Sequence, residues 1–446
     1  MKRSLLIIAA LGAALIAGCG GESALPEATG KGTVRAINTI ASSPEIAFLI
    51  EERQIGSANY KSATAAQEFD DLDYTFNFEV QFPTGRQRVA NQFLDVVADR
   101  DYVFVISGAL ASPTITLLEA ERRIFGETET VFEVRFGHFG TTLGDVDVYF
   151  ADPGTTPMLG QQIATLSPRD STEPVDYPEG EYELIYTVAG DPATVLFTSD
   201  TLTPTVRTAF AIGIFDADEN ELGQVSVRFF SEGSGTLFIP DVNAVPTVRF
   251  HHATMALATA DIYNDDPAMF PPIVMNHAFR DVTGDIPVLD GTNSLTYTAA
   301  GDTAVILFEN DLIPSTSGRI SYYIVGETDN LGAISTIADR RPVETLVKFS
   351  FLHAAYNHTL IDFYIVEADG DIADVIPSLF GVPPGTAPLT SNLRAGSFDL
   401  YMTVSGEKTV ITGPVRMDVA LGDIVDVIAY DNVDPAIADL VFIPLP

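Results

Sequence analysis

The chain has 446 residues, in which 61 Asp and Glu outnumber 24 Lys and Arg and give a formal charge of −37. A surface with this charge repels phosphate backbones, so we expect no nucleic-acid partner. A single cysteine rules out an intramolecular disulfide and a cysteine-ligated metal cluster, whereas an apolar fraction of 46% is enough to build folded cores.

Residues 1–18 have the pattern of a secretory signal peptide. Met1-Lys2-Arg3 supplies positive charge, and an uncharged, mostly aliphatic run extends from Leu5 to Ala17. This run is too short for a mature membrane-spanning helix, which needs ~20 residues, but it suits a signal-peptide core of roughly 7–15 residues. We therefore expect this segment to be removed.

The only cysteine, Cys19, follows Leu15-Ile16-Ala17-Gly18. This stretch resembles the lipobox of bacterial lipoproteins, which implies that Cys19 becomes the mature N-terminus and carries lipid. The alternative is an ordinary signal peptide with an incidental cysteine. Several acyl chains on one residue anchor a protein stably, and Gly20 in place of Asp implies the outer membrane within the same resemblance. Residues 19–32 then form the lipidated, flexible tether.

Four strands of similar sequence open four repeating units. They begin at Val34, Val134, Val248 and Phe349, with spacings of 100, 114 and 101 residues. Nine residues after the fifth position of each opening strand, a second predicted strand begins. The fifth position is His138, His252 or His353 in three units, and the residue nine further on is Asp147, Asp261 or Asp362. The unit boundaries predicted from this pattern are 33–130, 131–244, 245–343 and 344–446.

Each unit has the pattern of an antiparallel β-sandwich of immunoglobulin-like size. Roughly seven short strands of alternating or β-branched character occur per ~100 residues, separated by turn signals every 8–12 residues. Helical periodicity is weak, and short helix candidates are limited to Ala63–Asp70, Leu117–Phe125 and Asp371–Leu379. The fold class expected is therefore all-β, with four tandem sandwiches, and a linear array of such units would reach ~120 Å.

The repeats resemble a bacterial family known as domain of unknown function 4397. The resemblance rests on Val-Arg-Phe-x-His, nine residues to Asp-hydrophobe-Tyr, and Gly-x-Tyr-x-Leu near the middle of the unit. It is best at 134–230 and 248–340, good at 349–446 and poor at 34–128, where Asn38 and Ala47 replace the usual His and Asp. It implies an Ig-like sandwich in an envelope or secreted protein, often with tandem copies, and attaches no activity.

The repeated His and Asp are the sharpest polar pattern in the chain. They suit a structural role, in which the imidazole N–H bonds a carboxylate or carbonyl and fixes the first two strands of each sandwich. The alternatives are a metal ligand and a general base oriented by the carboxylate. One His and one Asp are too few ligands for a closed metal site, so we expect neither a metal nor a catalytic residue here.

Asp216 to Gly223 begins like a calcium loop. The sixth position lacks Gly and the twelfth holds Val227 in place of Glu, so the segment is not an EF-hand. An acidic turn between two strands is the preferred interpretation, with calcium binding left open.

We expect a non-enzymatic envelope lipoprotein that needs no cofactor. The sequence has no Gly-x-Ser-x-Gly, His-Glu-x-x-His, P-loop or dinucleotide motif. A surface-projecting array of sandwiches suits a spacer or a binding module for a protein or glycan partner, because sandwich loops and edge strands are common binding elements. The alternative is a carbohydrate-binding or carbohydrate-processing protein, for which Tyr263, Tyr297 and Tyr322 are the candidate aromatic contacts.

Overall fold

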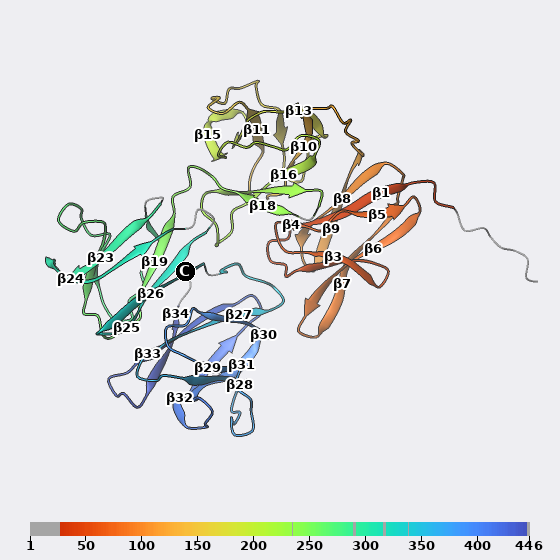
Figure 1. Cartoon of the computed structure of the whole chain (residues 1–446). Helices are drawn as coiled ribbons and strands as arrows, with labels where there is room; N and C mark the ends of the chain where they lie inside the picture. The colour runs from red at the N-terminus through yellow and green to blue at the C-terminus, as the bar shows by residue number, and fades with distance from the viewer. Residues whose placement is uncertain (1–26, 234, 289–290, 315–317, 338, 444–446) are drawn as a thin grey trace, which may run out of the picture.

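The computed structural model describes residues 27–233, 235–288, 291–314, 318–337 and 339–443. Within these ranges the chain forms strands, turns and loops, and it contains no helix that could cross a bilayer. The strands pair into eight sheets, two for each of four sandwiches, which confirms the expected all-β fold with four tandem units (Figure 1). The predicted signal peptide and Cys19 lie outside the described residues.

Sandwiches 1 and 2 contain the first eighteen strands. Sandwich 1 consists of β1 (Lys31–Asn38), β2 (Ile46–Ile50), β3 (Arg53–Ala58), β4 (Ser62–Ala63), β5 (Gln67–Asp70), β6 (Asp73–Phe82), β7 (Gly85–Asp95), β8 (Arg100–Ala109) and β9 (Ser112–Glu121). Sandwich 2 consists of β10 (Val131–His138), β11 (Val146–Ala151), β12 (Ala164–Leu166), β13 (Val175–Pro178), β14 (Glu183–Val188), β15 (Asp191–Thr198), β16 (Ala209–Asp216), β17 (Val225–Ser231) and β18 (Thr236–Ile239). The two sheets of sandwich 1 have the strand orders β4-β1-β8-β9, with β5 also paired to β1, and β3-β2-β6-β7. The two sheets of sandwich 2 have the strand orders β13-β10-β16-β17-β18 and β12-β11-β14-β15.

Sandwiches 3 and 4 repeat this plan. Sandwich 3 consists of β19 (Thr247–His252), β20 (Ala260–Asn264), β21 (Val274–His277), β22 (Ile286–Pro287), β23 (Asn293–Ala299), β24 (Asp302–Leu312), β25 (Ile320–Glu327) and β26 (Asn330–Ile337). Sandwich 4 consists of β27 (Val347–Ala354), β28 (Ile361–Glu367), β29 (Leu379–Val382), β30 (Leu389–Leu393), β31 (Gly396–Val404), β32 (Val410–Val419), β33 (Ile424–Asp431) and β34 (Ala438–Ile443). Their sheet orders are β22-β19-β25-β26, β21-β20-β23-β24, β30-β27-β33-β34 and β29-β28-β31-β32.

One strand pair in each sandwich is parallel, although the sequence predicts antiparallel sheets. The opening strand of every unit lies parallel to a late strand of the same unit: β1 to β8, β10 to β16, β19 to β25 and β27 to β33. Parallel neighbours need a long crossover connection, and here the connection builds the second sheet on its way. The first sheet of each unit therefore joins the beginning of the repeat to its end.

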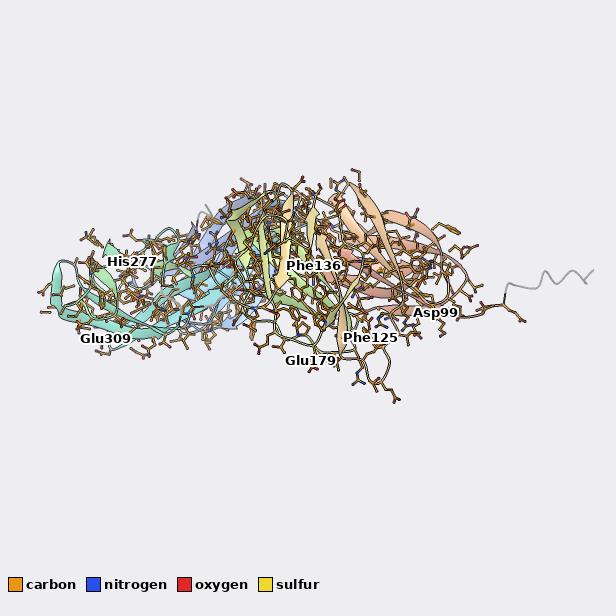
Figure 2. The ribbon with its side chains drawn as sticks, turned by 90° about the horizontal axis from the view of Figure 1, so that it is seen from above. Asp99, Phe125, Phe136, Glu179, His277 and Glu309 are labelled. Atoms are coloured by element: carbon orange, nitrogen blue, oxygen red, sulfur yellow. The ribbon has the colours of Figure 1, made fainter. Side chains whose placement is uncertain are left out.

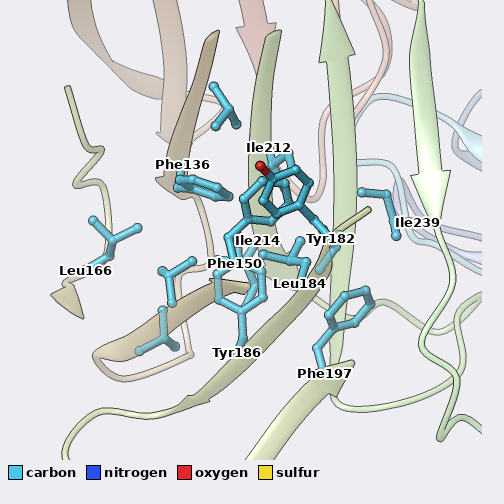
Figure 3. Close-up of a cluster of buried hydrophobic side chains, with 14 of the residues drawn as sticks. Phe136, Phe150, Leu166, Tyr182, Leu184, Tyr186, Phe197, Ile212, Ile214 and Ile239 are labelled. Atoms are coloured by element: carbon cyan, nitrogen blue, oxygen red, sulfur yellow. The ribbon is translucent and has the colours of Figure 1, made fainter. Parts of the chain in front are cut away.

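Each sandwich has its own apolar core between its two sheets. In sandwich 2 the core holds Phe136, Phe150, Leu184 and Ile212, all at most 5% exposed (Figure 3). The rings of Phe150 and Tyr182 stack with centroids 4.6 Å apart. Full burial of one such large apolar side chain contributes about 1.5–3 kcal/mol, so these clusters are the main source of stability for each unit.

The three helix candidates are wrong. Ala63–Asp70 contains the end of β4 and all of β5, and Asp371–Leu379 is a loop that ends at the start of β29. Leu117 lies in β9, opposite Phe104 of β8. Cross-strand pairing and burial outweigh a weak helical period in such short segments.

The sandwiches pack against one another instead of forming a line. Ile37 and Val105 of sandwich 1 share a buried cluster with Phe139, Phe215 and Phe230 of sandwich 2. A corresponding cluster joins sandwiches 3 and 4. Figure 1 shows the four units arranged around a common centre, and Figure 2 shows them from above, with Asp99 and His277 toward opposite ends and Phe136 between them.

Contacts between sandwich 1 and the segment before sandwich 4 complete this arrangement. The Arg341 guanidinium donates to the carbonyl oxygens of Ala41, at 2.7 Å, and Ser43, at 2.8 Å. The Glu344 backbone N–H donates to Ser42 O at 2.9 Å. The extended array of ~120 Å expected from the sequence is therefore wrong for the described residues, because the fourth unit lies back against the first.

The substitution Gly213→Ala tests the interface between sandwiches 1 and 2. A Cβ atom at Gly213 would lie 2.7 Å from the Phe139 ring and 3.0 Å from Phe230. We expect overpacking to lower the free energy of unfolding by about 1–3 kcal/mol, measured by thermal melting. The control Gly284→Ala places its Cβ where no atom lies within 4 Å. Equal melting temperatures for the two variants would contradict the packing described here.

Candidate functional site

The repeated histidines fix the loop between the first two strands of their units. The Gly140 N–H donates to His138 Nδ1 at 3.2 Å, and His138 Nε2 lies 2.9 Å from Gly144 O. In sandwich 4 the same two ring atoms bond Ala355 N, at 3.3 Å, and His358 O, at 2.9 Å. These partners require a neutral ring with its proton on Nε2. Both ring nitrogens are thus occupied by loop backbone.

The other two units hold this position differently. Asn38 replaces His in sandwich 1, and its Oδ1 accepts from Ile40 N at 3.0 Å while its Nδ2 donates to Ser43 Oγ at 2.8 Å. The Asn38 side-chain amide therefore fixes this loop in sandwich 1, as the imidazole does in sandwiches 2 and 4. His252 is buried, and its ring faces the backbone of Thr254 and Ala258, which lie at the same offsets as Gly140 and Gly144 from His138, although the contacts fall outside ordinary hydrogen-bond geometry. Burial lowers the pKa of His252.

The repeated aspartates hold two turns at once. Asp261 accepts from Asn276 N and Gly301 N, both at 2.8 Å, and Asp362 accepts from Gly381 N, at 2.8 Å, and Gly406 N, at 2.9 Å. Asp147 accepts from Thr165 Oγ1 and from Gly190 N, the latter at 2.7 Å. All three carboxylates are buried. Each one ties the third strand of its unit to the hairpin turn between the fifth and sixth strands, which are β14 and β15, β23 and β24, or β31 and β32.

This arrangement also explains the recurring glycine in the hairpin turn. Gly190, Gly301 and Gly406 have φ of 74°, 75° and 76°, a backbone conformation that favours glycine. In sandwich 1, Ala47 supplies no carboxylate, and the corresponding hairpin of β6 and β7 pairs out to Phe82 and Gly85. No hydrogen bond among the described residues joins a repeated His to its Asp. The geometry therefore supports loop fixation and gives no basis for an oriented general base.

The acidic loop Asp216–Gly223 is engaged in contacts within the chain. Asp216 accepts from the backbone N–H groups of Thr141, at 2.6 Å, and Leu143, at 3.0 Å. Lys61 of sandwich 1, which is 2% exposed, pairs with Asp218 at 3.2 Å and with Glu221. Burial alone would raise the pKa of Glu221, but Lys61 and Arg228 lower it. The acidic turn is thus a joint between the first two sandwiches.

The structure also bears on carbohydrate contact and on metal binding. Tyr263, Tyr297 and Tyr322 are at most 4% exposed, so they are core residues and the idea that they contact carbohydrate is wrong. Tyr297 and Tyr322 belong to the core of sandwich 3, whereas Tyr263 is buried on the opposite face of β20 from the core residue Ile262. Within the described ranges, no group of three or more His, Cys, Asp or Glu side chains is arranged as metal ligands.

A cleft of 440 Å³ lies between sandwiches 1 and 2. Side chains alternate along β1, so that Val34 and Ala36 enter the core while Arg35 and Ile37 face sandwich 2. The floor of the cleft is apolar and includes Phe139 of the interface cluster. Its walls carry seven charged residues: Arg35, Glu68, Asp101, Arg122, Glu133, Arg135 and Glu232.

Of the seven charged residues in this cleft, Arg35 is buried, Glu68 and Glu232 are exposed and the other four are half-buried. Most of them make no salt bridge within the described residues. Arg122 pairs with Glu68 at 3.1 Å. Arg35 and Arg135 donate only to backbone, Arg35 to Ser231 O at 2.7 Å and Arg135 to Glu119 O at 3.2 Å. Burial lowers the pKa of both arginines and raises the pKa of Glu133 and Glu232. Perturbed charges in a concave site are a mark of function, so this cleft is the candidate binding site.

Sequence reasoning did not find the cleft. The available signal was the arginine after the first core valine in three opening strands, at Arg35, Arg135 and Arg249. These arginines lie on the outward faces of their sheets. Their importance depends on which sandwich covers which face, and the repeat alone does not give that information.

Comparison with known proteins adds little to this description. No family model matches the chain, and no curated protein matches it. Among solved structures, the TIE protein of Bacillus anthracis matches at 11% identity and a TM-score of 0.16, over 86% of this chain and 66% of that chain. Likeness at this level carries no functional argument. The resemblance of the repeats to domain of unknown function 4397 stays a prediction.

The substitution Asp362→Ala tests the role of the repeated aspartates. It leaves the N–H groups of Gly381 and Gly406 without their acceptor, and we expect the free energy of unfolding to fall by about 1–3 kcal/mol. The control is Asp374→Ala, which removes an equal charge from an exposed loop position. Chemical denaturation measures both, and equal midpoints would refute the structural role.

Buried histidines predict that acid destabilises the protein. Burial lowers the pKa of His251 to about 3 and that of His277 to about 4, against ~6.5 in an unfolded chain. Between these values the unfolded state binds more protons, so stability falls as pH falls from about 6.5 toward 4, by about 1.4 kcal/mol per pH unit for each histidine.

The variant His251→Phe isolates one of these groups, because the new ring can keep the stacking on Tyr323, whose centroid lies 4.2 Å from that of His251. We expect the variant to lose part of the slope of unfolding free energy against pH. An unchanged slope would show that His251 does not contribute to the acid sensitivity. The pKa shifts of carboxyl groups contribute equally to the pH dependence of both chains, so they cancel when the two slopes are compared.

Proposed function

We propose that this chain is a non-enzymatic lipoprotein of the cell envelope that binds a protein or glycan partner through the cleft between sandwiches 1 and 2. The single observation that supports binding is that Arg35, which is buried, and Arg135, which is half-buried, have only backbone hydrogen-bond partners within the described residues. Charges of both signs on the cleft walls favour an ionic partner over a neutral glycan.

The anchor belongs to this proposal. The lipobox-like stretch before Cys19 and the uncharged run of residues 5–17 support lipidation and attachment to the outer membrane. Thr33 at the cleft lies 14 residues after Cys19, so an extended tether places the cleft at most ~50 Å from the lipid. Since the four units pack together, a compact binding platform is a better description than a long spacer.

The substitution Cys19→Ala tests the anchor, and capture from envelope extracts tests the cleft. We expect the wild-type chain in the membrane fraction and the variant in the soluble fraction. In the capture experiment we expect a specific partner with the wild type and at least a tenfold loss with Ala120→Trp, whose ring would fill the cleft at β9. Capture is measured by quantitative mass spectrometry.

The matched control is Ala193→Trp, which places the same ring on an exposed position of β15. Equal capture by both tryptophan variants would move the binding surface away from the cleft. Membrane association of Cys19→Ala would contradict the lipid anchor.

A further inference from the structure

The internal repeat provides a comparison for the arginines of the cleft. Arg35, Arg135 and Arg249 occupy the same place in the opening strands of sandwiches 1, 2 and 3. An antiparallel strand runs beside each of them, with registers Val34↔Gln67, Val134↔Val175 and Val248↔Ile286. One step further along each pair, these registers place Ala66 opposite Arg35, Pro174 opposite Arg135 and Asp285 opposite Arg249.

In sandwich 3 the opposing carboxylate is present and neutralises the arginine. Asp285 pairs with Arg249 at 3.0 Å, with Arg319 at 2.6 Å and with Arg340 at 3.6 Å. The three guanidinium groups hold the pKa of Asp285 below its usual value, although burial alone would raise it. In sandwich 3 the arginine at this position of the repeat therefore has a carboxylate partner.

In sandwiches 1 and 2 the residue at that place has no charge. Ala66 and Pro174 both line the cleft. Arg35 is 9% exposed, and Arg135 Nε is buried without a hydrogen-bond partner. Burial lowers the pKa of Arg35, whereas Glu232 and Asp101 act against this change and Arg135 adds to it. The guanidinium group of Arg35 therefore lies near charges of both signs. The two arginines of the cleft thus lack a salt bridge like the one that Arg249 makes with Asp285, although Asp101 acts on both of them from a longer distance.

The acidic residues of the cleft restrict what can supply that carboxylate. Asp101, Glu133 and Glu232 line the same space, so the charges without a salt bridge are two positive and three negative. A simple anion would be repelled by this balance, whereas a ligand that also carries an ammonium group satisfies both sets. A cleft of 440 Å³ is within the range of roughly 300–1,000 Å³ for small-molecule sites.

We infer that the cleft binds a short peptide as a zwitterion, with its carboxylate between Arg35 and Arg135 and its ammonium toward Glu133 and Glu232. This inference rests on the proposed binding role and names the chemical class of the ligand. Planar guanidinium groups suit bidentate pairing with a carboxylate, and loss of either terminal charge of the peptide leaves charges of the cleft without a salt bridge.

Isothermal titration of the full chain in detergent tests the ligand class, with dialanine as the probe. We expect dialanine to bind and both its C-terminal amide and its N-acetyl derivative to bind at least tenfold more weakly. We also expect Ala66→Asp to abolish dialanine binding and to raise the melting temperature, because the new carboxylate takes the place that Asp285 fills in sandwich 3. Pro174→Asp is a second variant with the same expectation.

The control Ala193→Asp adds an equal charge on β15, outside the cleft, and should bind dialanine as the wild type does. Absence of heat with dialanine, equal binding of the blocked peptides, or unchanged binding by folded Ala66→Asp and Pro174→Asp would each overturn the ligand class. Partner capture that is still lost in Ala120→Trp would then show that the cleft binds a ligand of another kind. Capture that Ala120→Trp leaves unchanged would mean that the proposed role of the cleft itself is wrong.

Discussion

The strict alternation of side chains along the opening strands is the constraint on which the rest of the structure depends. The inward residues build four separate cores, and the outward residues of the same strands decide how the sandwiches meet. Along β1 the outward face changes from Thr33 and Arg35 to Ile37 within five residues. The apolar end is buried against sandwich 2, and the charged end is left as the cleft.

Much of each unit could be predicted from the sequence, because the repeat marks positions that local geometry requires. The opening strands, the second strands and the His and Asp positions act within one unit, so their spacing is enough to find them. The parallel pairing of β1 with β8 and the cleft depend on contacts between distant segments and between units. The spacing of apolar residues along the sequence does not show which outward sheet face packs against which neighbouring sandwich. The weak helical pattern of Leu117–Phe125 failed for the same reason, since β8 determines its conformation.

The large negative charge has two different roles in the structure. Most of the described acidic residues are not buried, and charges of one sign at the surface oppose self-association. A few are used internally, as in the loop Asp216–Gly223, where Lys61 is buried between carboxylates of the neighbouring sandwich. Basic residues are scarce, and several of them lie at joints between units: Lys61, Arg280 and Arg341. Arg35 and Arg135 of the cleft differ because neither makes a salt bridge with a carboxylate of the described chain.

The contact between Ser42 and Glu344 joins residues 302 positions apart. During synthesis the first sandwich is made long before the segment that fastens it to the fourth. Each sandwich has its own core, whereas the contact between Ser42 and Glu344 forms only after Glu344 has been made. A truncated product would therefore keep the cores of its complete units while exposing the surfaces that the finished assembly covers.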